Sequence, residues 1–185
     1  VIRLDMSRGG ATVVELRAYL DRIFAKYEKE YGIQNIEGDS LSNRFDAIIT
    51  TAYEQTGQQV AILIDEYDAP LLHSWKTPEH EGCTAVYRSV FAILKADDEY
   101  EKFVFITGIT KFTQISLFSV LNNLSNISFD APYAAICGIT KQEIAENFMP
   151  EIEAMGENNG WTVDETVEQL KANYDGYHFS RNNMV

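Results

Sequence analysis

Apolar residues follow strand-like and helix-like spacings in turn along residues 1–107. Residues 1–6 alternate between apolar and polar side chains, while 60–64 and 103–107 are almost continuously apolar, so all three segments are predicted to be strands. A continuous run such as 60–64 is typical of a strand covered on both faces. Between these runs, apolar residues fall three or four positions apart, as on one face of a helix. This alternation predicts an α/β fold with a parallel sheet, because parallel strands need long crossover connections that are usually helical.

The helical segments carry start and stop signals as well as apolar stripes. Thr12 and Glu15 fit a capping box, in which a hydroxyl and a carboxylate each satisfy a free backbone amide at the helix start. A second helix is predicted over 41–56, ended by Gly57, and a third before the polar stretch 97–102. The stripes of the three helices are Leu16, Leu20, Ile23, Phe24 and Tyr27; Leu41, Phe45, Ile48 and Ala52; and Val86, Val90, Ile93 and Leu94.

The composition changes in the following part of the chain. Residues 112–130 are rich in Ser and Asn with Leu and Phe between them, which predicts a loop with a short helix. Residues 127–129 and 133–136 are each predicted to form a short strand.

Two further capping boxes begin at Thr140 and Thr162, and each precedes an apolar stripe of helical spacing. We therefore expect an α/β core over residues 1–139, followed by a C-terminal helical segment over 140–185.

The most informative stretch for chemistry is VAILIDEYDAPLL, residues 60–72, in which an apolar strand ends in Asp65, Glu66, Tyr67 and Asp68. Ionised carboxylates repel one another and resist leaving water, so their concentration after a buried strand suggests a function. Ligands of parallel sheets gather at the carboxyl ends of the strands, where Thr107 also lies.

Metal-assisted hydrolysis of a phosphoanhydride needs residues of these types at such an edge. We assign Asp65 to Mg²⁺, directly or through water, and Glu66 to orienting or deprotonating the attacking water. Thr107 is assigned to a hydrogen bond with the terminal phosphate or with that water. The structural alternative is that the acids cap a helix N-terminus. We favour that alternative for Asp68, which directly precedes Ala69-Pro70.

A phosphate-binding loop of the form G-x-x-x-x-G-K-[ST] is absent from the printed sequence, because no Gly-Lys dipeptide occurs in its 185 residues. The glycine-bearing segment Ser7–Gly10 lacks both the lysine and the spacing, and is predicted to be a turn.

Charge and composition narrow the class of protein. A formal net charge of −13 gives no support to nucleic-acid binding, which favours clustered Lys and Arg. The two cysteines, Cys83 and Cys137, are not in a C-x-x-C pair and are expected to be free thiols in a reducing compartment.

Without an apolar run of about 18 residues, we expect no membrane span and a soluble, cytoplasmic protein. His73, His80 and Cys83 lack a second ligand pair, so a surface loop is favoured over a zinc site.

Several ordered blocks resemble the AAA-ATPase-like family of bacterial and archaeal proteins, whose members often carry a C-terminal nuclease-like domain of the PD-(D/E)XK type. The resemblance covers nearly the whole chain. The blocks are ILIDEYDAPLL, FVFITGITKF, LNNLSNISFDAPYAAICGITKQEI and YDGYHFS. This resemblance implies a P-loop NTPase in which Ile62–Glu66 is the Walker B strand and Phe105–Gly108 the sensor strand. Lys111 lies where a phosphate-sensing cation could sit.

The resemblance also implies what surrounds these residues in the family. There the Walker A loop and its helix precede the strand that matches Val1–Met6, so we expect the chain to begin just after that element and to end before the nuclease-like domain. The implied fold is a three-layer, P-loop NTPase-like parallel sheet that lacks the Walker A strand. Residues 103–107 would then form an unpaired edge, open to self-association. ATP and Mg²⁺ are the implied cofactors of the full-length protein, and we expect the isolated chain to be inactive.

Two alternatives use the same acids differently. A non-catalytic, nucleotide-regulated interaction module would need the same carboxylates, and the sequence does not separate it from an ATPase. A metal-dependent nuclease of the PD-(D/E)XK type needs an acid two positions before a lysine, which none of the eight lysines has.

Overall fold

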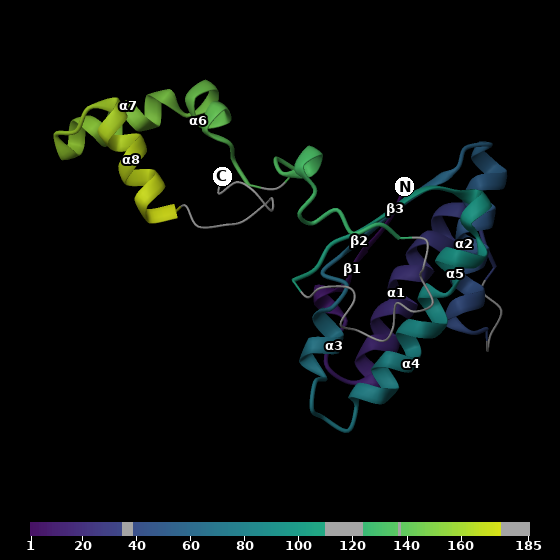
Figure 1. Cartoon of the computed structure of the whole chain (residues 1–185). Helices are drawn as coiled ribbons and strands as arrows, with labels where there is room; N and C mark the ends of the chain where they lie inside the picture. Colours follow the sequence, from purple (N-terminus) through teal and green to yellow (C-terminus); the bar gives the residue numbers. More distant parts are fainter. Residues whose placement is uncertain (35–38, 110–123, 137, 175–185) are drawn as a thin grey trace. The chain divides into compact units, whose positions relative to one another are not determined.

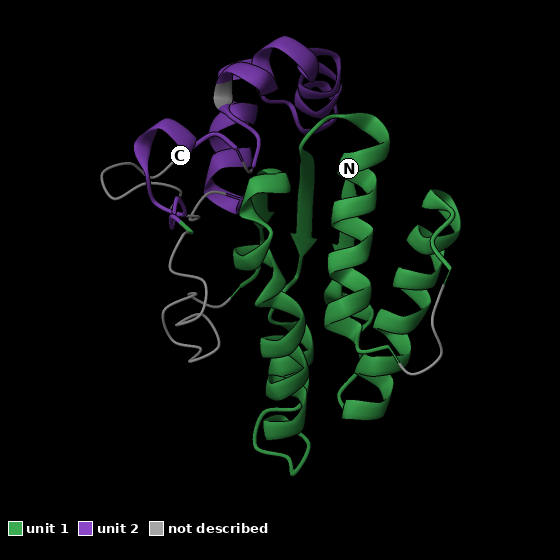
Figure 2. Cartoon of the chain, turned by 90° about the vertical axis from the view of Figure 1, so that its right-hand side faces the viewer, with its two compact units in different colours: residues 1–124 green, residues 125–185 purple. Residues whose placement is uncertain are grey.

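The computed structural model describes residues 1–34, 39–109, 124–136 and 138–174. The chain divides into two compact units, Val1–Leu124 (unit 1) and Ser125–Val185 (unit 2), which Figure 2 colours green and purple. This division lies earlier in the chain than the boundary expected after residue 139.

Unit 1 contains a parallel sheet of three strands in the order β1-β2-β3. The strands are β1 (Ile2–Asp5), β2 (Val60–Asp65) and β3 (Glu101–Ile106). In the register of the sheet, Asp5 lies beside Asp65, and Ile64 lies beside Ile106. The mixed α/β fold with a parallel sheet is therefore confirmed, and the carboxyl ends of the strands meet at one edge (Figure 1).

The helices of unit 1 begin and end largely where the sequence signals predict. Thr12 forms both hydrogen bonds of a capping box with Glu15 at the start of α1, and Gly57 ends α2 with a left-handed φ of 64°. The helical elements are η1 (Met6–Arg8), α1 (Val13–Tyr31), α2 (Leu41–Thr56), α3 (Ala69–His73), α4 (His80–Phe91), α5 (Ile93–Ala96) and η2 (Asp98–Tyr100). The predicted third helix is divided at Ala92 into α4 and α5. The apolar spacing continues across Ala92, and Val90 and Leu94, on either side of it, are both buried. The sequence pattern therefore does not indicate the division.

The core of unit 1 lies between the sheet and the helices that connect its strands. Helices α1, α2 and α4 contact one another, and they group with α5 in Figure 1. Burial alternates along β1 and β2, as expected of strands covered on one face. The strand residues buried in this core are Ile2, Leu4, Val60, Ile62 and Ile64. Ala61 and Leu63 are only half-buried, and 51% of Phe103 is exposed. The described part of unit 1 thus has two layers, and the third layer stays a prediction.

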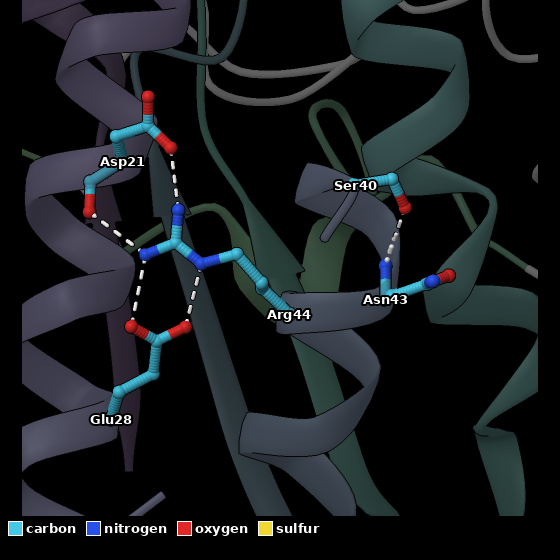
Figure 3. Close-up of polar contacts among 5 residues, drawn as sticks. All are labelled: Asp21, Glu28, Ser40, Asn43 and Arg44. Carbon is cyan, nitrogen blue, oxygen red and sulfur yellow. Dashed lines mark hydrogen bonds and ion pairs between the residues drawn. The ribbon is translucent and has the colours of Figure 1, made fainter. Parts of the chain in front are cut away.

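A buried ion pair fastens α1 to α2. The Arg44 guanidinium donates from Nε to Oε1 of Glu28 at 2.6 Å and from Nη2 to Oε2 at 2.9 Å. Its Nη1 donates to the carboxylate of Asp21, as Figure 3 shows beside the cap of α2, where Ser40 Oγ accepts from the Asn43 amide. Only 8% of the Arg44 side chain and 4% of the Glu28 side chain are exposed. Two parallel hydrogen bonds therefore pair the two buried charges.

Unit 2 contains η5 (Ala131–Tyr133), α6 (Lys141–Asn147), α7 (Met149–Asn159) and α8 (Val163–Tyr174). The predicted capping boxes at Thr140 and Thr162 are both confirmed. The strands predicted at 127–129 and 133–136 are wrong, because turns and a single 3₁₀ turn occupy these residues. Pro132 has no amide to donate to a sheet, and the local bonds from Tyr133 N to Asp130 O and from Ile136 N to Tyr133 O replace strand pairing.

In the described part of the chain, every helix is too short or too polar to cross a lipid bilayer.

Candidate functional site

The carboxyl edge of the sheet brings together residues from three distant parts of the chain. Asp5 and Asp65 are the last residues of β1 and β2 and lie side by side. Thr107 directly follows β3, whose Ile106 is in register with Ile64. The predicted grouping of Asp65, Glu66 and Thr107 at one edge is therefore present in the structure.

The carboxylate of Asp65 is exposed and oriented by two donors. Its Oδ1 accepts a hydrogen bond from the Thr107 hydroxyl and another from the backbone amide of Glu66 at 3.0 Å. These bonds fix the direction of a carboxylate that still faces solvent. An exposed and oriented carboxylate is suited to accept a cation.

Glu66 is exposed and has a backbone φ of 47°, which lies in the left-handed region. This conformation is costly for a residue with a Cβ, by about 1–2 kcal/mol. The carbonyl of Glu66 accepts from the amide of Ala69 at 3.0 Å, so the strand passes into α3 through a tight turn. Strain at a residue that bears an acid is characteristic of functional sites.

Backbone bonds hold this turn against the end of β3. The Thr107 amide donates to the carbonyl of Ile64 at 2.9 Å, and the Thr107 carbonyl accepts from the Tyr67 amide at 3.0 Å. The pairing of β2 with β3 therefore continues past the last residue of either strand. These hydrogen bonds therefore join the backbone of the turn that carries Glu66 to the backbone of Thr107.

Asp68 differs from its predicted role as a helix cap. Helix α3 does begin directly after it, with Pro70 in the first turn, but the Asp68 side chain makes no capping hydrogen bond. Instead the side chain is buried, with 2% of the residue exposed. The prediction of the helix start is confirmed, and the prediction of a side-chain cap is wrong, because the carboxyl group turns inward.

The edge offers carboxylate oxygens, which are ligands that Mg²⁺ prefers, but its described residues do not offer a complete set of protein ligands for a metal ion. Among the residues that the structure describes, no group of three His, Cys, Asp or Glu side chains is placed to hold a metal ion. Mg²⁺ commonly uses one or two carboxylates together with waters and phosphate oxygens, and the exposed carboxylate of Asp65 is a ligand of that type.

The surface loop predicted around His73, His80 and Cys83 is confirmed only for residues 74–79, because His73 ends α3 and both His80 and Cys83 lie in α4. Cys83 is fully buried in the core, where burial raises the pKa of its thiol. His80 lies edge-on against Trp75 with ring centroids 4.9 Å apart, and its Nδ1 is 3.2 Å from the hydroxyl of Ser74.

Lys111 and Asp5 remain among the residues that bear on this edge. Lys111, the predicted phosphate-sensing cation, lies outside the described residues. Asp5 is a residue of the edge that the sequence analysis does not predict, although its position at the end of a predicted strand is a signal for it. Its Oδ1 accepts from the amide of Ser7 at 3.2 Å and from the Ser7 hydroxyl at 2.6 Å, and Arg8 Nε lies 3.7 Å from Oδ2.

Comparison with known proteins gives one family and one curated relative. The model of the family described as "Predicted AAA-ATPase" matches residues 1–118. A protein of Azotobacter chroococcum mcd 1, described as "Uncharacterized protein in vnfD 5'region", is 29% identical over 185 residues, covering 96% of this chain. The chain spans 33% of the length of that relative. No solved structure matches the chain.

Proposed function

Because the chain belongs to the family described as Predicted AAA-ATPase, we propose that its full-length protein binds ATP with Mg²⁺ and hydrolyses it. The residues proposed to serve this reaction are Asp65, Glu66 and Thr107. The observation that carries the proposal is the hydrogen bond from the Thr107 hydroxyl to Asp65, which joins two strand ends at the ligand-binding edge of a parallel sheet.

Asp65 is the proposed anchor for the magnesium ion. Its carboxylate is exposed, and one oxygen is held by the Glu66 amide and the Thr107 hydroxyl. When bound, Mg²⁺ supplies charge neutralisation for the phosphate oxygens. The charge of Asp65 retains the ion at the sheet edge.

Glu66 is the proposed base, or water-positioning residue. Glu66 is exposed and directly follows Asp65, and its left-handed backbone departs from the conformation of the strand. Thr107 is proposed to bond the terminal phosphate or the attacking water through its hydroxyl. Lys111 is proposed to sense the phosphate from the segment that follows.

The printed residues contain no Gly-Lys dipeptide and therefore no phosphate-binding loop of the usual form. We propose that they hydrolyse no ATP on their own and bind it weakly at most, because they lack the backbone amides and the lysine with which that loop holds the phosphates. Isothermal titration of the 185-residue chain with Mg-ATP tests this statement, and a micromolar affinity would contradict it.

The decisive experiment compares Glu66→Gln with wild type in the full-length protein. We expect Glu66→Gln to lower turnover by roughly 100-fold or more, as for removal of a general base, with Mg-ATP affinity retained. Glu30→Gln, at an exposed acid in the last turn of α1, is the matched control and should leave both quantities unchanged.

Each result of that experiment has a clear meaning. A Glu66→Gln variant with wild-type turnover would reject the assigned role. Wild-type protein that binds Mg-ATP but does not turn it over would favour the nucleotide-regulated interaction module instead.

A further inference from the structure

Gly108 follows Thr107 and lies against the turn that carries Glu66. A Cβ built on Gly108 would lie 2.5 Å from Cε1 of Tyr67 and 2.6 Å from Oδ1 of Asp68. Carbon atoms do not approach that closely, so any side chain at this position would push the two segments apart. The φ of Gly108 is not among the positive values of the described residues, so the position requires glycine for space alone.

The two side chains that face Gly108 have little freedom to move away. Tyr67 and Asp68 are each 2% exposed, and Tyr67 belongs to the hydrophobic core of unit 1. Both residues follow Glu66 directly in the chain. A displacement of either one would therefore shift the backbone of the acid-bearing turn.

The same contact is bracketed by backbone hydrogen bonds. Tyr67 donates to the Thr107 carbonyl, and Thr107 donates to the Ile64 carbonyl. These bonds require Thr107, which directly follows β3, to lie within hydrogen-bonding distance of the turn that carries Glu66. The bare Cα of Gly108 allows this approach one residue beyond the bonded pair.

We propose that Gly108 is a positioning residue: its missing side chain lets Thr107 and Glu66 be held at one fixed separation. This inference rests on the proposed function for its effect on turnover. The physical link between the two segments can be tested without any activity.

Hydrogen exchange in the full-length protein tests the link itself. In Gly108→Ala, the amides of Tyr67 and Thr107 should exchange faster by roughly tenfold or more, because local opening becomes easier. Gly82→Ala is the matched control, since its Cβ would meet Val13 Cγ2 at 2.4 Å in the contact of α1 with α4, away from the edge. This control should leave the two amides as in wild type. Unchanged exchange in Gly108→Ala would overturn the inference.

Steady-state kinetics tests the consequence for the reaction. Gly108→Ala should lower kcat by roughly 10- to 100-fold, as small misplacements of reacting groups do, while KM for ATP stays near wild type. A smaller folded fraction would also lower the apparent kcat without changing KM, so kcat is expressed per folded protein, with the folded fraction measured by circular dichroism. Gly82→Ala should change neither constant. If the wild type shows no hydrolysis, the proposed function fails, while hydrogen exchange still decides the inference.

A compensating change keeps the inference testable should Gly108→Ala be poorly folded. Tyr67→Leu removes the ring that the new methyl group would meet first. The double variant should show slower exchange at the amide of Thr107 than Gly108→Ala, or regain a folded state that the single variant lacks. No such recovery would contradict a steric role for Gly108.

Discussion

The Thr107 hydroxyl donates a hydrogen bond to Oδ1 of Asp65, although 42 positions separate the two residues in sequence. The bond joins the ends of neighbouring parallel strands, and Asp65 receives a second bond there from the amide of Glu66. The Thr107 hydroxyl orients the Asp65 carboxylate, and it is also the group proposed to contact a ligand. Substitutions that keep its shape distinguish the hydroxyl from the rest of the side chain.

Thr107→Val keeps the size of the side chain and removes the hydroxyl. We expect kcat in the full-length protein to fall by roughly 10- to 100-fold, because a donor at the reacting phosphate or water is lost. Thr107→Ser retains the hydroxyl and should stay within a few-fold of wild type. Equal turnover by the Val and wild-type proteins, measured as phosphate release, would contradict the assignment.

Glu66→Asn should stabilise the protein while abolishing turnover. Asn tolerates the left-handed region better than Glu, so relief of strain should raise the free energy of unfolding by up to about 1 kcal/mol. Lys76 is the other non-glycine residue with positive φ in the described part of the chain, at 61°. Lys76→Asn should stabilise similarly without affecting turnover. Urea denaturation measures both changes, and a less stable Glu66→Asn would argue against stored strain.

Local sequence signals were enough to predict much of unit 1. The capping box at Thr12, the glycine stop at Gly57 and the apolar strand before Asp65 are short-range features, and each is confirmed. The proximity of Asp65 and Thr107 is predicted by a general rule, because the carboxyl ends of parallel strands lie at the same edge of a sheet.

Features that depend on contacts between distant segments could not be read in this way. In sequence, Gly108 looks like any glycine after a strand, yet its importance comes from the packing of Tyr67 and Asp68. Arg44 likewise occupies an ordinary polar position between Leu41 and Phe45, and only the approach of α1 shows that it is buried. The strands predicted at 127–129 and 133–136 are wrong because Pro132, between the two segments, favours the 3₁₀ turn η5 over strand pairing.

Arg44→Met should destabilise unit 1 strongly. It would leave the Glu28 carboxylate buried without its bidentate partner, a loss of about 3–5 kcal/mol in the free energy of unfolding. Combining it with Glu28→Leu removes the orphaned charge and should recover much of that loss. Arg22→Met is the control, because Arg22 lies over the Tyr19 ring at 5.6 Å on the exposed side of α1. If chemical denaturation finds no difference between Arg44→Met and Arg22→Met, the Arg44–Glu28 ion pair does not stabilise unit 1.

Phe103→Lys should reduce self-association of the 185-residue chain. In the described structure β3 pairs only with β2, and 51% of Phe103 is exposed on this edge strand. Lysine on an edge opposes pairing with another chain. Arg3→Gln, on the opposite edge strand β1, is the control. Sedimentation velocity over a range of concentrations should show smaller species for Phe103→Lys alone, and an unchanged distribution would exclude this edge as the contact.

A group of acids near the start of β3 gives the stability of unit 1 a pH dependence. Asp97 is 5% exposed and Glu101 is 9% exposed, and one carboxyl oxygen of each is buried without a hydrogen-bond partner among the described residues. Burial, followed by the carboxylates of Asp46 and Glu99, raises the pKa of Asp97 to about 6. Burial, followed by Asp97 and Asp98, raises the pKa of Glu101 to about 8.

Glu101→Gln should therefore make the protein more stable at pH 8 and less sensitive to pH. Because the pKa of Glu101 rises from 4.5 to about 8 on folding, the folded state retains a proton that the unfolded state has released between these values. Stability is then fully present below pH 4.5 and is lost as the pH rises toward 8. Gln keeps the shape without the charge, so Tm at pH 8 should increase by about 5 °C, and the decline from pH 5 to 8 should become shallower. Glu30→Gln, at an exposed acid, should follow the wild-type curve, and a Glu101→Gln curve parallel to wild type would show that Glu101 is not the group that titrates.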